Sequence, residues 1–233
     1  MKKILLFCFC ALACFTLLTP PAEAAKSDWA DKSYNFRNVK TALVCDINTS
    51  KVTLANDIVE KNLQELFQQK ADKLRIQHLT YDQASRKISL KLFKDLDELH
   101  KSAPEEAEAL FHANLSDLAE IYITADLLQY ETGGYTVPAH TEWRNREETN
   151  TWTDKDGKQH TDTHTITYPE FVPDEYVSTV TVKVRFDAVD AKTGSTIFSR
   201  EEDRTRTSED NPHDVYGRII SSFFSDLGDK INK

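Results

Sequence analysis

"YVSTVTVKVRFDAVD", residues 176–190, is the stretch of sequence that decides the fold. From Val180 to Ala188 its apolar residues stand at every second position, and the residues between them are threonine or charged. This alternation predicts a β-strand with one buried and one solvated face, as antiparallel sheets have. Lys192-Thr193-Gly194 then predicts a tight turn with Gly194 in the left-handed conformation, and "TIFSREEDRTR" (196–206) returns as the partner strand.

The rest of the chain alternates between strand and helix patterns. "VKTALVCDI" (39–47) has the continuous apolar centre of a strand that is covered on both faces. Apolar residues at helical spacing, and the capping residues before them, predict helices over about 57–72, over most of 82–101, from Pro104 onward and after Asn211-Pro212, with further strands near 74–79 and 120–130. We therefore predict an α/β (α+β) fold: a mixed, mainly antiparallel sheet packed with helices, plus a long protruding β-hairpin arm.

The domain organisation follows from changes in composition. Residues 1–24 are predicted to be a signal peptide, because Lys2 and Lys3 precede the apolar run 4–18, and Ala22-Glu23-Ala24 supplies a cleavage site. A retained anchor and lipidation at Cys14 remain as alternatives. Residues 25–38 predict a flexible lead-in, and 39–233 a single domain with the inserted arm at 135–176. Export to the periplasm or cell envelope is the expected localisation.

Charge and cysteine content exclude several functions. The chain carries a formal charge of −9, and loss of Lys2, Lys3 and Glu23 changes this to −10. An acidic chain without a basic stripe is a poor binder of nucleic acid and of anionic membranes. Cleavage would leave Cys45 as the last cysteine, so no intramolecular disulfide could form, and its apolar surroundings favour a small buried residue over a reactive thiol.

No catalytic motif is found in the sequence. It lacks G-x-S-x-G, H-E-x-x-H and a phosphate-binding glycine loop. Asp126, within a predicted strand, is expected to sit at a face change or to pair with a neighbour rather than to be buried with a raised pKa. We therefore expect a protein that is not an enzyme and that needs no cofactor.

The arm is predicted as a hairpin closed by Asp154–Gly157. Placing Thr153 opposite Lys158 also sets Tyr135 opposite Tyr176 and Pro138 opposite Pro173. Both faces are polar, which excludes a transmembrane hairpin. Because a two-stranded ribbon is marginally stable alone, we expect the arm to contact its own domain, a second copy or a partner protein.

Two sets of residues in the arm are candidates for function. Trp143 and Trp152 are candidate interaction residues, with packing on their own hairpin as the alternative. His160, Asp162 and His164 share one strand face, with Glu147 as a possible fourth ligand, and could hold zinc. The strand is solvent-exposed and threonine-rich and offers no groups to orient the imidazoles, so a solvated hairpin is preferred and no metal is assigned.

A resemblance supports the predicted fold. "EIYITADLLQY" (120–130), followed by "VTVKVRFDAVDAKTGSTIFSREEDRT" (180–205), resembles a strand pair of bacterial envelope proteins. The chain is similar over about 39–130 and 176–231 to the curli-secretion lipoprotein, the N-terminal domain of the Tol-Pal β-propeller protein and lipoprotein activators of penicillin-binding proteins. The resemblance implies an α/β fold that acts by binding, while the arm departs from that pattern.

The preferred hypothesis is an exported, non-enzymatic protein of the bacterial envelope. It would contact a protein partner or form a homo-oligomer, through the arm or through the wet face of the 176–190 strand, which carries Thr179, Thr181, Lys183, Arg185 and Asp187. A periplasmic metal-binding protein that uses His160, Asp162 and His164 is the alternative. A hydrolase with an unrecognised site is the third hypothesis.

Overall fold

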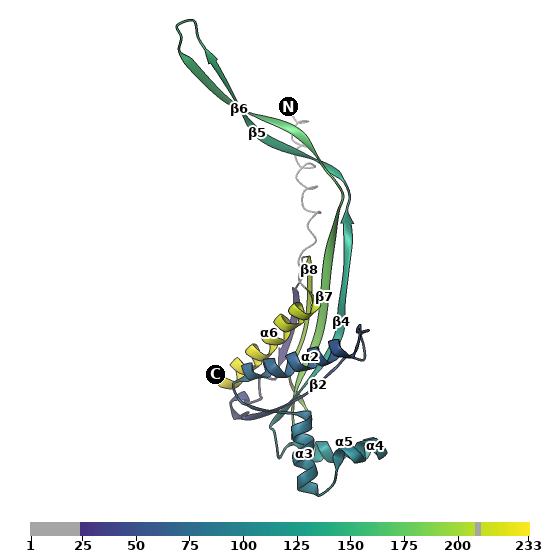
Figure 1. Cartoon of the computed structure of the whole chain (residues 1–233). Helices are drawn as coiled ribbons and strands as arrows, with labels where there is room; N and C mark the ends of the chain where they lie inside the picture. Colours follow the sequence, from purple (N-terminus) through teal and green to yellow (C-terminus); the bar gives the residue numbers. More distant parts are fainter. Residues whose placement is uncertain (1–23, 208–210) are drawn as a thin grey trace, which may run out of the picture. The chain divides into compact units, whose positions relative to one another are not determined.

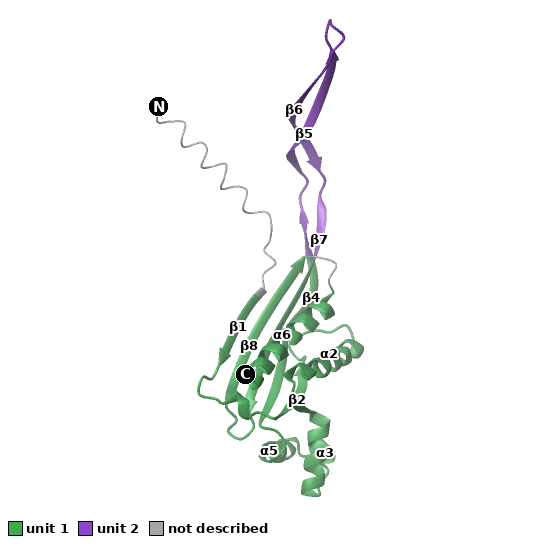
Figure 2. Ribbon diagram, turned by 90° about the vertical axis from the view of Figure 1, so that its left-hand side faces the viewer, with its two compact units in different colours: residues 1–133, 179–233 green, residues 134–178 purple. Residues whose placement is uncertain are grey.

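The computed structural model describes residues 24–207 and 211–233, which form two compact units. Unit 1 contains the described residues up to Gly133 and from Thr179 onward, and unit 2, called the arm below, is Gly134–Ser178 (Figure 2). The mixed α/β fold predicted from the sequence is confirmed. The predicted signal peptide lies outside the described residues, apart from Ala24.

Unit 1 is organised around a six-stranded mixed sheet in the order β1-β8-β7-β4-β2-β3 (Figure 1). Strands β7 and β8 pair antiparallel, as the alternating sequence predicts, whereas β2 pairs parallel with both β3 and β4. The parallel pairs arise because helices cross over between these strands. The strands are β1 (Ala24–Ala30), β2 (Thr41–Asn48), β3 (Gln77–Thr80), β4 (Ile121–Val137), β7 (Glu175–Asp190) and β8 (Thr196–Thr207).

Most of the described α-helices begin at side-chain caps, whereas the helix that starts at Pro104 has none. Asn56 and Asn211 accept hydrogen bonds from the first turns of α2 and α6, and Thr80 forms a capping box with Gln83 at α3. The predicted helix over 82–101 is divided, because Phe93 takes a left-handed conformation after α3 and Asp95 caps α4. The helices are η1 (Phe36–Asn38), α2 (Asp57–Lys70), η2 (Ala71–Leu74), α3 (Tyr81–Leu92), α4 (Leu96–Ser102), α5 (Pro104–Leu115) and α6 (Pro212–Asn232).

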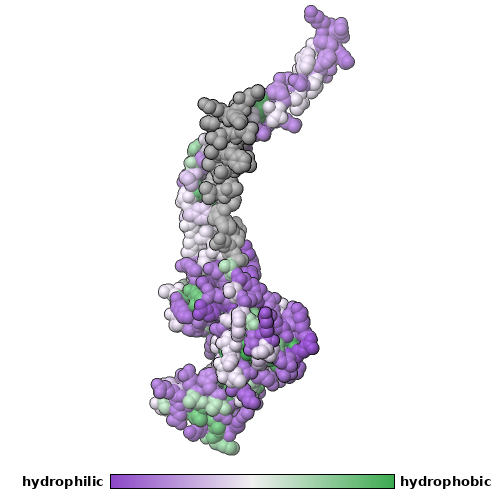
Figure 3. All heavy atoms as spheres, turned by 180° about the vertical axis from the view of Figure 1, so that it is seen from behind, coloured by the Kyte–Doolittle hydropathy of each residue, from purple (hydrophilic) through white to green (hydrophobic). Residues whose placement is uncertain are grey.

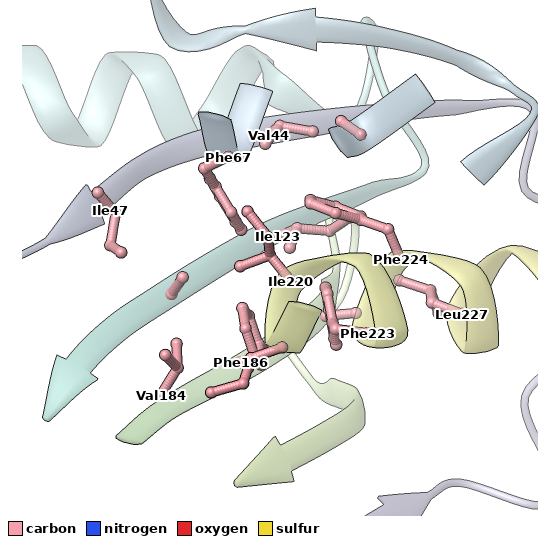
Figure 4. Close-up of a cluster of buried hydrophobic side chains, with 14 of the residues drawn as sticks. Val44, Ile47, Phe67, Ile123, Val184, Phe186, Ile220, Phe223, Phe224 and Leu227 are labelled. Carbon is pink, nitrogen blue, oxygen red and sulfur yellow. The ribbon is translucent and has the colours of Figure 1, made fainter. Parts of the chain in front are cut away.

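The main hydrophobic core lies between the sheet and helices α2 and α6. Figure 4 shows Phe186 of β7 beside Phe223 of α6, whose rings stack with centroids 4.2 Å apart, and Phe67 of α2 near Phe224. Every second residue of β7 from Val180 to Ala188 is buried in this cluster, as the alternation predicts. This core stabilises unit 1, since burial of an aromatic or aliphatic side chain contributes about 1.5–3 kcal/mol.

A second, smaller core lies on the opposite face of β2. It joins Leu43 and Leu79 to Ile88 of α3 and to Phe111 and Leu115 of α5. The chain passes from β2 through α2 to β3, and then back through α3–α5 to β4 on the other side of β2. Because both crossovers are right-handed by rule, the two helix groups cover opposite faces.

The segment expected to be a flexible lead-in, 25–38, contains a strand and a short helix. Strand β1 pairs antiparallel with β8, with Asp28 opposite Arg200. Arg200 is 1 % exposed, and its guanidinium donates to Asp28 at 2.7 and 2.9 Å and to Asp226 of α6 at 2.8 Å. These charge-assisted bonds connect β1 to β8 and α6, which the polar sequence 25–30 alone does not indicate.

Candidate functional site

The arm contains a two-stranded antiparallel sheet formed by β5 (His140–Thr153) and β6 (Gln159–Val172). Thr153 pairs with Gln159, so the predicted pairing with Lys158 is wrong by one residue. The difference lies in the turn, where Asp154 Oδ1 accepts from the amides of Asp156 (3.0 Å) and Lys158 (2.9 Å) and Gly157 adopts φ +80°. This side-chain-capped loop holds five residues, and His164 therefore pairs with Glu148 instead of the predicted Glu147.

Alternate pairs of β5 and β6 form one face of the ribbon, here called the neutral face. It carries eight threonines and one charged residue, Glu147, and all of its side chains are exposed. The hydroxyls of Thr149 and Thr163 lie 3.2 Å apart, and Thr167 donates to Asn145 at 2.8 Å. The neutral face comprises Thr141, Trp143, Asn145, Glu147, Thr149, Thr151, Thr153, Gln159, Thr161, Thr163, Thr165, Thr167, Pro169 and Phe171.

The remaining pairs form the opposite face, here called the charged face. Its side chains contact one another across and along the strands: Arg144 forms ion pairs with Glu142 and Glu170, and Arg146 pairs with Glu148 and lies over the ring of Tyr168. The charged face comprises His140, Glu142, Arg144, Arg146, Glu148, Asn150, Trp152, His160, Asp162, His164, Ile166, Tyr168, Glu170 and Val172. Such exposed pairs contribute little stability, about 0–1 kcal/mol each.

The candidate metal ligands lie on the charged face but do not converge. His160 Nε2 lies 2.7 Å from Asp154 Oδ2, and this hydrogen bond is the largest cause that lowers the pKa of Asp154 below its ordinary value. His164 Nε2 instead lies 4.0 Å from Glu148 Oε2. In the described part of the chain, no three His, Cys, Asp or Glu side chains are grouped so that they could hold a metal ion. The geometry does not favour the metal-binding hypothesis for His160, Asp162 and His164.

The two candidate tryptophans lie on opposite faces of the ribbon. The Trp152 ring stacks on His160, with centroids 5.5 Å apart and an interplanar angle of 17°, so it packs on its own hairpin. Trp143 is 71 % exposed on the neutral face, directly opposite Pro169 and one pair away from Phe171, which is 70 % exposed. Sequence reasoning missed Phe171. This residue stands two positions after Pro169 on the same strand, and an exposed aromatic side chain there could have been named as an interface anchor, as Trp143 was.

No residue of the arm, Gly134–Ser178, is buried. A ribbon of this kind has cross-strand hydrogen bonds and surface contacts but no apolar core, and two strands alone are marginally stable in water. The space-filling view shows mostly purple and pale residues on the arm, with small green patches (Figure 3). The arm therefore exposes almost all of its side chains for contact.

The wet face of β7, the second predicted contact surface, contains an ion-pair ladder with β8. Glu201 accepts from Lys183 at 2.7 Å and from Arg185 at 2.7 and 3.1 Å. The hydrogen bond from Lys183 is the largest cause that lowers the pKa of Glu201. Thr181 and Thr205 approach to 3.2 Å on the same face. These side chains satisfy one another within unit 1.

Two other residues singled out in the sequence have ordinary structural roles. Cys45 is half-buried against the second core, and burial raises the pKa of its thiol to about 12, so it is protonated at neutral pH. Asp126 accepts from Asn48 at 2.8 Å and Lys51 at 2.9 Å. Partial burial acts to raise the pKa of Asp126, but these bonds outweigh it and lower the pKa, as expected of a paired carboxylate.

Comparison with known proteins gives distant structural likenesses only. The chain matches no known protein family, and no curated protein is similar to it. Among solved structures, the PelC dodecamer from Paraburkholderia phytofirmans is 13% identical, with a TM-score of 0.45, over 88% of this chain and 98% of that one. Lipoprotein GNA1162 from Neisseria meningitidis is 11% identical, with a TM-score of 0.36, over 81% and 98%. Resemblance to the three families named above stays a prediction.

None of the described helices is both long enough and apolar enough to cross a membrane.

Proposed function

We propose that this chain is an exported, non-enzymatic protein of the bacterial envelope that acts by protein–protein contact through the arm. The observation that carries the proposal is the contrast in burial. Unit 1 has two hydrophobic cores, whereas no residue of Gly134–Ser178 is buried. A long segment without a core of its own is marginally stable alone, so its role is best explained by what it contacts.

Exposed aromatic side chains support a protein partner over a small ligand. Trp143, Trp152, Phe171 and Tyr176 are each at least half exposed. Aromatic residues are enriched at protein interfaces, where they become the anchors that carry most of the binding energy. The predicted signal peptide supports export to the periplasm or cell envelope.

Site-specific photocrosslinking in the native bacterium tests the proposal. A photoreactive amino acid replaces Trp143 on the arm, and in a matched variant it replaces Ile58, a 68 % exposed apolar residue on α2 of unit 1. We expect a discrete crosslinked protein from position 143 and none from position 58. Absence of any adduct from position 143, or the same adducts from both positions, contradicts the proposal.

A further inference from the structure

The neutral face of the arm differs from the charged face in how its side chains are satisfied. On the charged face, Arg144, Arg146 and His160 have partners within the ribbon. On the neutral face, the side-chain hydrogen bonds between the strands are the hydroxyl pair Thr149–Thr163 and the Thr167–Asn145 bond. The neutral face therefore presents exposed methyl groups, hydroxyls and aromatic rings that are available to contact another surface.

The neutral face has an aromatic end. Trp143 and Phe171 occupy neighbouring residue pairs and are both about 70 % exposed. Large rings left in water on a polar ribbon are the side chains whose burial releases most free energy on association. Beyond them, threonines follow at period two toward the turn, so the whole face could pack against another flat β surface.

We propose that the neutral face is the contact surface for the same face of a second copy of this chain. The inference rests on the proposed function of the arm and names its partner. The chain carries a net charge of −9, so two copies repel each other unless they meet where charge is absent. A face with one charge among fourteen residues meets this condition, and it offers little for a charged foreign partner to recognise.

A contact between two copies is isologous, so the same residues face one another about a two-fold axis. Glu147 occupies the fourth of the seven residue pairs on the neutral face, at its centre. An axis near the centre brings the two Glu147 carboxylates close together, and facing like charges are destabilising. The single charge on this face thus limits the affinity of the dimer.

The size of the surface sets the expected strength of association. Seven residue pairs at every second position extend from Thr141 to Thr153 and span roughly 40 Å at the ordinary strand rise of about 3.4 Å per residue. The ribbon is two strands wide, about 10 Å, so the face offers roughly 400 Å². This is small beside a standard interface of about 800 Å² per partner, so we expect a reversible dimer in the micromolar range.

Sedimentation of the full chain, exported and purified from the envelope, tests the inference over a range of concentrations. Thr151→Glu places a charge on the neutral face, and Ile166→Glu places the same charge on the charged face, directly opposite Arg146. We expect Thr151→Glu to weaken the dimer at least about tenfold and Ile166→Glu to leave it unchanged. Glu147→Gln removes the central charge and should tighten the dimer, a gain that unfolding of the arm cannot produce.

The outcomes separate this inference from the proposed function. A monomeric wild-type chain that stays monomeric with Glu147→Gln overturns the self-contact, as does equal weakening by Thr151→Glu and Ile166→Glu. If crosslinks from Trp143 in cells then lead to a different protein, the proposed function stands and the choice of partner is wrong. If the chain is monomeric and the photoreactive residue at position 143 gives no crosslink, both the self-contact and the proposed function are wrong.

Discussion

Unit 1 and the arm come from one chain, yet they are held together in different ways. Unit 1 has a sheet covered on one face by α2 and α6, with Phe186, Phe223 and Phe224 at its centre. The arm has two strands, a capped turn and exposed ion pairs, with no buried residue. The comparison teaches that regular strand pairing and stability are separate matters: both regions are well-paired β structure, but only unit 1, among the described residues, buries apolar side chains fully.

The sharpest way to test this comparison is to truncate one aromatic residue in each region. Phe223→Ala removes a fully buried ring that stacks on Phe186, and we expect unfolding free energy to fall by about 3–5 kcal/mol. Trp143→Ala removes a larger but exposed ring and should change it by no more than about 0.5 kcal/mol. Urea denaturation of both variants measures the difference. An equal loss of unfolding free energy in both variants would mean that Trp143 is packed in a hydrophobic core, which contradicts the comparison.

Ion pairs offer a second comparison, now between buried and exposed charges. Arg200→Met leaves Asp28 and Asp226 without their guanidinium partner, and we expect a loss of about 3 kcal/mol, at the low end for a broken buried pair because both carboxylates remain accessible to water. Arg144→Met in the arm breaks exposed pairs with Glu142 and Glu170 and should alter stability by less than about 1 kcal/mol. Calorimetry of thermal unfolding measures the stability of the Arg200→Met and Arg144→Met variants; equal losses would contradict the comparison.

Two glycines on one helix sharpen the account of packing in unit 1. A Cβ at Gly228 of α6 would lie 2.6 Å from the carbonyl oxygen of Lys73 in η2, so Gly228→Ala should destabilise unit 1 by about 1–3 kcal/mol. A Cβ at Gly217 would meet only Leu66 Cδ2 at 3.4 Å, so Gly217→Ala should be neutral or stabilise by up to about 1 kcal/mol through helix propensity. The denaturation midpoints of the two variants measure the difference. A stabilising Gly228→Ala would contradict this account, because it would mean that the backbone of η2 moves away from the added Cβ without cost.

Much of unit 1 could be predicted because its patterns are local. Residues close together in the sequence determine the alternation from Val180 to Ala188, the Gly194 turn and the cap at Asn211. Strand β1 was missed because 24–30 shows no alternation of apolar and polar residues and is held by Arg200, a residue 172 positions away from Asp28. The burial of a charged residue at a core position of an alternating strand cannot be predicted until the residues that pair with its charge are known.

The arm was predicted as a hairpin, but its details depend on one turn. Counting from Asp154–Gly157 gave a register wrong by one residue, because Lys158 belongs to the loop and its amide donates to Asp154. A slip of this size changes every cross-strand neighbour, which is why Glu147 was assigned to His164. The face assignment of His160, Asp162 and His164 on β6 survived, because residues two apart on one strand share a face in any register.

The smallest expected effect on the whole protein comes from the turn of the arm. Asp154→Ala removes the acceptor of the Asp156 and Lys158 amides and the partner of His160, so amide exchange at 156 and 158 should accelerate at least about tenfold while unit 1 unfolds at an unchanged temperature.

Acid should mimic this substitution in the wild-type chain. The pKa of Asp154 is lowered in the fold, first by the hydrogen bond from His160, so the turn is held by the carboxylate above the ordinary value of 3.8 and opens as pH falls through the lowered pKa. Hydrogen exchange across this range measures the opening, with Asp154→Ala as the variant that shows no further change. If Asp154→Ala instead lowers the unfolding temperature of unit 1, the two regions are energetically coupled and the comparison fails.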